Sequence, residues 1–121
     1  MERNHYELNN GITVEKLKEV GFKDGGWMRN IQEPKVSYRQ PLIDEIELYI
    51  EINTDTLEFD ENENIFVLDD TFNQAYFPFY NENTNVEFAV KVKRDYNRRM
   101  DALVEEGIFT KVNEKVKKKT K

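Results

Sequence analysis

The chain has 121 residues and a formal net charge of −6, and its length favours a single domain. Its eight Phe, six Tyr and one Trp can supply the buried area of a core, which argues against a disordered chain. Because the sequence has no cysteine, it excludes disulfides, cysteine-ligated zinc and a thiol nucleophile. The N-terminus lacks a signal-peptide pattern and no apolar run reaches the ~20 residues of a membrane span, so we expect a cytoplasmic protein that does not bind membranes.

The first predicted element is a short helix from Thr13 to Phe22. Thr13 can cap the N-terminus of this helix, and Gly21 can adopt the left-handed conformation that ends it. Two strands over residues 27–31 and 35–39 are then predicted to form a hairpin.

The clearest strand signal covers residues 45–52. Four aliphatic residues alternate along one face, namely Ile46, Leu48, Ile50 and Ile52, while Glu45, Glu47, Tyr49 and Glu51 occupy a face that we expect to be wet. Shorter alternating runs over 57–60 and 65–68, separated by turn residues, predict two further strands and a three-strand meander.

A C-terminal helix is predicted to begin at Thr84 and Glu87, which have the spacing of a capping box, and to end at Gly107. Its apolar stripe consists of Ala89, Val92, Tyr96, Met100 and Leu103. The predicted core comprises Leu17, Phe22, Ile46, Leu48, Ile50, Leu57, Phe59, Val67, Val92, Tyr96, Met100 and Leu103.

These elements predict an α+β fold. We expect an antiparallel sheet of four to five strands, with the short N-terminal helix and the long C-terminal helix packed on one face. The domain is predicted to span residues 1–110, and residues 111–121 to form a basic, disordered tail.

The distribution of charge is the strongest functional signal. From Gln40 to Val90 the chain has no Lys or Arg, but it has thirteen carboxylates: Asp44, Glu45, Glu47, Glu51, Asp55, Glu58, Asp60, Glu61, Glu63, Asp69, Asp70, Glu82 and Glu87. Such a one-sided field repels nucleic acid and attracts cations or basic protein surfaces. Solubility and protection of sheet edges are the alternative explanation.

We expect the partner-binding surface to be a lattice of carboxylates on two neighbouring strands. Glu45, Glu47 and Glu51 lie on the first strand, and Glu58 and Asp60 on the next. Residues two apart on a strand are ~6.6 Å apart and neighbouring strands are ~4.8 Å apart, so these carboxylates can approximate an array of phosphates.

Five aromatic residues lie between Phe72 and Tyr80, interrupted by Pro78. The proline predicts a loop or an edge, and we expect the rings mainly to cap the core. Tyr76 and Tyr80 are expected to be partly exposed and to join the binding surface. The alternative function from this segment is an accessory module that self-associates as a homodimer.

The sequence shows no phosphate loop, nucleophile elbow or metalloprotease helix, and its single His5 lies in a segment expected to be mobile. We therefore expect no catalysis and no cofactor. The alternative is a small enzyme or divalent-metal protein that uses acidic loop residues, namely Asp60, Glu63, Asp69 or Asp70. A calcium-loop pattern starts at Asp60, but Ile65 replaces the required Gly and Thr71 the required Glu.

The C-terminal helix carries five basic residues, Lys91, Lys93, Arg94, Arg98 and Arg99. We interpret them as counter-charge for the acidic block or as a solvated face, because direct contact with nucleic acid would have to overcome the acidic block.

In size, single-domain layout, lack of cysteine and segregated acid, the chain resembles small phage or mobile-element accessory proteins, including anti-CRISPR inhibitors and other DNA mimics. This resemblance implies a non-enzymatic inhibitor in the host cytoplasm that occupies a basic nucleic-acid-binding surface of a host protein. The basic tail departs from that type.

Overall fold

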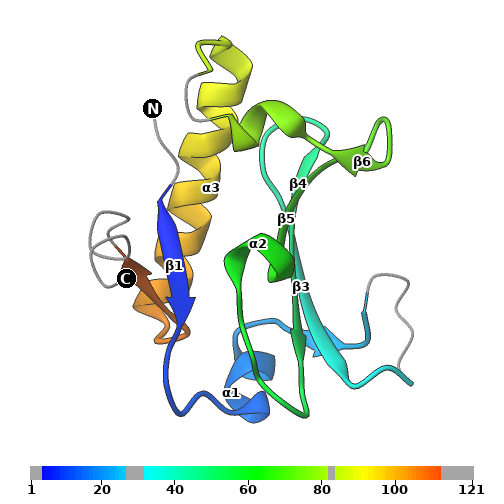
Figure 1. Cartoon of the computed structure of the whole chain (residues 1–121), viewed down its shortest axis with the longest axis vertical. Helices are drawn as coiled ribbons and strands as arrows, with labels where there is room; N and C mark the ends of the chain where they lie inside the picture. Colours follow the sequence, from blue (N-terminus) through cyan, green and yellow to red (C-terminus); the bar gives the residue numbers. More distant parts are fainter. Residues whose placement is uncertain (1–3, 27–31, 82–83, 113–121) are drawn as a thin grey trace.

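The computed structural model describes residues 4–26, 32–81 and 84–112. Its five-stranded antiparallel sheet has the order β2-β3-β4-β5-β6, and a separate antiparallel pair joins β1 to β7 (Figure 1). The strands are β1 (His5–Leu8), β2 (Lys23–Asp24), β3 (Lys35–Pro41), β4 (Ile46–Asn53), β5 (Ile65–Asp69), β6 (Gln74–Ala75) and β7 (Phe109–Val112). The helices are α1 (Val14–Glu19), α2 (Glu61–Asn64), the 3₁₀ helix η1 (Phe77–Tyr80) and α3 (Glu87–Glu105). The predicted α+β class and antiparallel sheet are confirmed.

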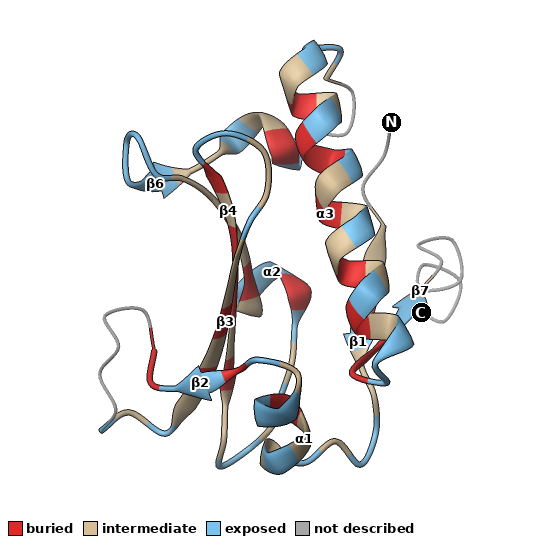
Figure 2. Ribbon diagram, turned by 180° about the vertical axis from the view of Figure 1, so that it is seen from behind, coloured by how far each residue is buried: buried red, intermediate tan, exposed pale blue. Residues whose placement is uncertain are grey.

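Helix α3 and the β1–β7 pair lie on one side of the five-stranded sheet, and the opposite side has no helix over it in the described structure (Figures 1 and 2). The space between sheet and helix is filled by apolar side chains from both layers. Tyr96 of α3 is fully buried there, and its ring centroid lies 6.2 Å from that of Tyr6 and 4.8 Å from that of Phe79. The main core therefore lies between α3, the β1–β7 pair and one face of the sheet.

Helix α1 forms as its sequence predicts. The Thr13 side chain accepts a hydrogen bond from the Lys16 N–H at 3.1 Å, and Gly21 has the positive φ of 118° that the helix terminator requires. The chain then forms β2 directly, which we did not predict. The predicted strand at 27–31 lies outside the described residues.

The predicted strand at 57–60 is wrong. Strand β4 pairs directly with β5, and the chain between them is a loop in which Leu57 has a φ of 54°. The alternation of apolar and acidic residues resembles that of a strand because Leu57 and Phe59 both pack against the core. The ring centroids of Phe59 and Phe109 are 5.1 Å apart. The following residues form α2, which is capped by Asp60, and not the turn that we expected.

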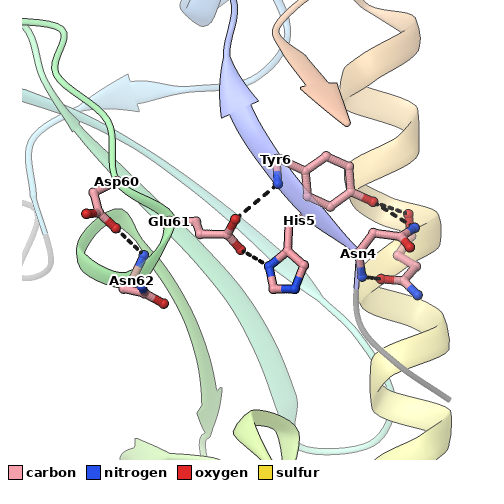
Figure 3. A network of polar contacts seen from close by, with 7 residues as sticks. Asn4, His5, Tyr6, Asp60, Glu61 and Asn62 are labelled. Atoms are coloured by element: carbon pink, nitrogen blue, oxygen red, sulfur yellow. Dashed lines mark hydrogen bonds and ion pairs between the residues drawn. The ribbon is translucent and has the colours of Figure 1, made fainter. Parts of the chain in front are cut away.

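The expectation of a mobile His5 is also wrong, because this residue belongs to β1. Its Nδ1 lies 3.1 Å from Oε1 of Glu61, and the Tyr6 N–H donates to the other oxygen of that carboxylate at 3.2 Å (Figure 3). Glu61 is 6% exposed. Its buried carboxylate thus joins α2 to β1, an interaction between distant segments that no local pattern indicated.

The apolar stripe of α3 is buried as predicted, and the N–H of Ile108 closes the helix on the Leu103 carbonyl at 3.0 Å. The predicted capping box is wrong: the helix begins at Glu87, and Thr84 accepts from the Val86 N–H instead. After the helix, β7 pairs with β1 and reaches Val112, two residues beyond the predicted domain end; residues 113–121 lie outside the described residues.

Candidate binding surface at one end of the sheet

Two predicted site residues, Glu47 and Glu51, lie on the solvent face of β4, and each has a basic neighbour on β3. The Arg39 guanidinium lies 2.8 Å from Glu47, and the Lys35 ammonium 3.2 Å from Glu51. The strand pairing brings these charges together, since β3 runs alongside β4 over its whole length. Both carboxylates are therefore ion-paired, although Lys35 also contacts the Glu33 carboxylate at 3.2 Å.

The face that we expected to be wet is centred on Tyr49, which is only 2% exposed. The ring is covered by Arg39, at 5.5 Å from its centroid, and by Phe66, at 5.9 Å. The Tyr49 hydroxyl donates to Glu51 at 2.7 Å. Burial raises the pKa of the Tyr49 phenol above its ordinary value, and its hydrogen bond to the Glu51 carboxylate raises that pKa further. The hydrogen bond to Glu51 likewise raises the pKa of Lys35.

The predicted lattice of carboxylates does not form. Glu58 lies in the exposed loop after β4, and Asp60 caps α2 through the Asn62 N–H. The strand that does neighbour β4 places Phe66 and Leu68 opposite Tyr49 and Glu47. The lattice fails because the sequence segment assigned to the neighbouring strand is a loop.

The two predicted aromatic site residues belong to the segment after β6 and not to β4 or α2. Tyr76 is partly buried against Phe88, with ring centroids 5.8 Å apart, and burial raises the pKa of the Tyr76 phenol. Tyr80 is 38% exposed, and its hydroxyl accepts a hydrogen bond from the Val67 N–H at 3.1 Å. The partial exposure expected for both residues is confirmed.

A different group of carboxylates is brought together at the end of the sheet where β4 begins and β5 ends. Residue Ile46 pairs with Asp69, and the Asp70 N–H donates to the Glu45 carbonyl at 2.8 Å. The β3–β4 turn and the β5–β6 turn consequently lie side by side. We call their four carboxylates the acidic rim: Asp44, Glu45, Asp69 and Asp70.

Local backbone geometry fixes both turns of the acidic rim. Asp44 adopts a left-handed conformation with a φ of 51°, which Asp tolerates better than most residues. In the other turn, Asn73 has a φ of 53°, and the Asp69 carboxylate accepts from the Thr71 N–H at 3.0 Å. The backbone conformation of both turns that carry the rim carboxylates is therefore fixed by local contacts and residue type.

An exposed aromatic ring lies in the same turn as two rim carboxylates. Phe72 is 69% exposed, and its N–H donates to the Asp69 carbonyl at 3.3 Å. Figure 2 shows this turn projecting from the sheet with an exposed tip. Our expectation that the aromatic segment mainly caps the core holds for the buried Phe79, but is wrong for Phe72 and for Phe77, which is 67% exposed.

The acidic rim differs from the open sheet face in its electrostatics. Among the described residues, none of its four carboxylates has a basic side chain within ion-pair distance. By contrast, Glu47 and Glu51 both have such partners. The rim is thus an acidic surface whose charge is available to a partner, unlike that of Glu47 and Glu51.

Of the rim residues, only Glu45 is among the predicted partner-binding residues; Asp69 and Asp70 were predicted only as alternative metal ligands, and Asp44 and Phe72 were not assigned to the site. The sequence could have indicated the rim, because the start of one antiparallel strand lies beside the end of the strand that pairs with it. With strand 65–68 placed directly beside strand 45–52, residues 44–45 and 69–70 would have been predicted to meet. The false strand at 57–60 concealed this relationship.

The residues of the metal-binding alternative are not brought together. Asp60 and Glu63 belong to the α2 region, whereas Asp69 and Asp70 follow at the far end of β5, about 13 Å away along an extended strand of this length. Within the described ranges, no group of three or more His, Cys, Asp or Glu residues could hold a metal ion. No helix in those ranges is long and apolar enough to cross a membrane.

The sequence matches no protein-family model, and no curated protein matches it. Among solved structures, the fold is similar to that of a DUF1831 family protein from Lactobacillus plantarum, with a TM-score of 0.65 and 16% sequence identity. The match covers 90% of this chain and 88% of the other. At this level of identity the similarity concerns the fold alone.

Proposed function

We propose that this protein is a binding protein that docks on a basic protein surface through the acidic rim and Phe72. The observation that carries the proposal is the exposed Phe72 in the same turn as Asp69 and Asp70, a turn that the Asp70–Glu45 backbone hydrogen bond joins to the turn of Asp44 and Glu45. None of these four carboxylates has an ion-pair partner among the described residues. Charged side chains around an apolar anchor are a common arrangement in protein interfaces, where the charges steer association and the anchor slows dissociation.

The geometry supports this surface better than the face of β4. A partner that used Glu47 or Glu51 would have to displace Arg39 or Lys35, whose contacts at 2.8 and 3.2 Å already stabilise those carboxylates. Docking on the rim displaces no described ion pair. The cost of binding is therefore lower at the rim.

The resemblance to phage-type inhibitors adds a narrower form of the proposal. In that form, the basic surface of the partner is the one that binds nucleic acid, and the protein inhibits by occupying it without catalysis. Duplex DNA should then compete with the protein for the partner, whereas an adaptor that binds elsewhere on the partner is insensitive to DNA.

The proposal is tested by affinity capture with three forms of the full chain: wild type, the rim variant D44N/E45Q/D70N and the control variant D55N/E58Q. The control removes two exposed carboxylates from the loop after β4, at the opposite end of the strand. A partner of the rim is retained by wild type and by D55N/E58Q, is lost from the rim variant, and elutes as salt rises because exposed charges are screened.

Two results would refute this assignment. Retention of the same partner by the rim variant would show that the rim is not the docking surface. Equal loss from both variants would show that only net charge matters. Sedimentation of the protein alone separates docking from self-association, since a dimer formed through the aromatic residues survives high salt and the rim substitutions.

A further inference from the structure

A cleft of about 190 Å³ lies between α3 and the residue that follows β3. It is lined by Leu42, Asp95, Arg98, Arg99 and Ala102. Its chemistry is opposite to that of the acidic rim, because two guanidinium groups border it. Volumes of roughly 300–1,000 Å³ are usual for drug-sized ligands, so this cleft suits a smaller molecule.

Arg99 carries a positive charge in the cleft that no carboxylate of the described residues balances. It is half-buried, and no ion-pair partner for it is found among residues 4–26, 32–81 and 84–112. Arg98, in contrast, lies 3.3 Å from the Asp95 carboxylate. With Arg98 and Asp95 cancelling each other, the cleft retains one positive charge at Arg99.

Arg99 also acts through its charge on a buried side chain of β3. Its charge lowers the pKa of the Tyr38 phenol, against the larger raising effect of burial. Tyr38 is 6% exposed. Because Arg99 is itself half-buried, an anion that pairs with its guanidinium gains more than at a fully exposed arginine.

We propose that this cleft binds a small carboxylate with a short aliphatic chain. The planar guanidinium of Arg99 matches a carboxylate through two parallel hydrogen bonds. Leu42 and Ala102 provide apolar walls for the chain of the ligand. The neighbouring Asp95 favours a singly charged ligand over phosphate, because a second negative charge would be repelled. This inference is independent of the rim and its partner.

The test is a titration of the isotope-labelled full chain with acetate, butyrate and phosphate, at an ionic strength held constant with chloride. The readout is the NMR signal of the Arg99 Nε–H and of the backbone amides of residues 98–102. We expect saturable shifts, with affinity rising by up to about fourfold for each buried CH₂ group. Phosphate should bind more weakly than butyrate.

Two variants and a control make the result specific. R99Q should weaken butyrate binding at least tenfold, whereas R94Q, which removes an exposed arginine from the same helix, should leave it unchanged. D95N should bind phosphate more tightly than wild type. Because this variant keeps Arg99, it still tests the cleft if R99Q disturbs folding. The proposal is wrong if the carboxylates cause no larger NMR shifts than chloride alone or if affinity does not depend on the length of the ligand's aliphatic chain. It is also wrong if R94Q and R99Q lose butyrate affinity equally.

Discussion

The backbone N–H of Asp70 donates a 2.8 Å hydrogen bond to the carbonyl oxygen of Glu45. This contact links the turn before β4 to the turn after β5, and it continues the strand register in which Ile46 pairs with Asp69. The acidic rim is therefore a product of strand pairing. This pairing joins the turn that carries Phe72 to the turn that carries Asp44 and Glu45.

Truncation of Phe72 to alanine should weaken binding of the partner and leave stability almost unchanged. The ring is 69% exposed, so the free energy of unfolding should change by less than about 0.5 kcal/mol. An aromatic anchor buried at an interface contributes about 1–2 kcal/mol or more, which corresponds to at least fivefold in affinity. Calorimetric titration and urea denaturation of F72A measure the two quantities.

Phe77 is the matched control for this prediction, because it is 67% exposed and lies outside the β5–β6 turn. The variant F77A should bind the partner as wild type does. If F77A loses as much affinity as F72A, the docking surface extends over the whole aromatic segment and the rim is not its centre.

Replacement of Glu61 by alanine should destabilise the fold. The variant leaves the buried Tyr6 N–H without its carboxylate acceptor and removes the contact with His5. A buried donor left without an acceptor costs about 1–3 kcal/mol, which urea denaturation can resolve. The exposed Glu63 in the same helix provides the control, and E63A should change stability by less than about 0.5 kcal/mol. Equal effects of the two substitutions would show that the carboxylate of Glu61 does not join α2 to β1.

Stability should fall as the pH rises above about 10, where tyrosine ionises in the unfolded chain. The folded protein keeps the phenols of Tyr6 and Tyr49 neutral to higher pH, because burial raises both pKa values. A raised pKa in the folded state contributes stability that is fully present below the pKa of the unfolded chain and is lost as pH rises toward the folded value. Each such group contributes a slope of at most about 1.4 kcal/mol per pH unit.

The variant Y49F tests the contribution of one phenol to this alkaline slope. Urea denaturation between neutral pH and the alkaline range should show a shallower fall for Y49F than for wild type. At neutral pH the variant should lose the hydrogen bond to Glu51, at a cost of about 1.5–3 kcal/mol for a bond to a charged acceptor. Parallel curves for the two proteins would contradict the assignment of the raised pKa to Tyr49.

The parts of the fold that depend on local chemistry could be predicted from the sequence. Thr13 and Gly21 define the ends of α1 through contacts within a few residues, and the stripe from Ala89 to Leu103 defines the buried side of α3. In these cases the periodicity of the backbone and the chemistry of the side chains agree.

The parts that failed depend on pairing between distant segments. The alternation of Leu57 and Phe59 arose from a loop that packs on β7, and the pairing of β1 with β7 joins residues about a hundred positions apart. The same limitation applied to the site. The acidic block is evident in the sequence, but Lys35 and Arg39, which form ion pairs with its β4 carboxylates, lie outside the block.

The buried Lys93 shows another limit of pattern reasoning. It was interpreted as part of a solvated or counter-charged face, but its side chain is fully buried and Nζ donates to the Asn81 carbonyl at 2.6 Å. Helical periodicity places Lys93 beside the apolar stripe, but a lysine at such a position is expected to extend to solvent. The acceptor comes from the chain before the helix, so only the tertiary fold makes this burial tolerable.

The most direct test of the account is to map where a basic probe contacts the full chain. A short arginine-rich peptide is titrated into isotope-labelled protein at low salt, and the backbone amide shifts are followed by NMR. The largest shifts should occur at residues 44–45 and 69–73, and added salt should reverse them. Largest shifts at residues 47–51 or 55–60, or shifts spread evenly over all exposed carboxylates, would contradict it.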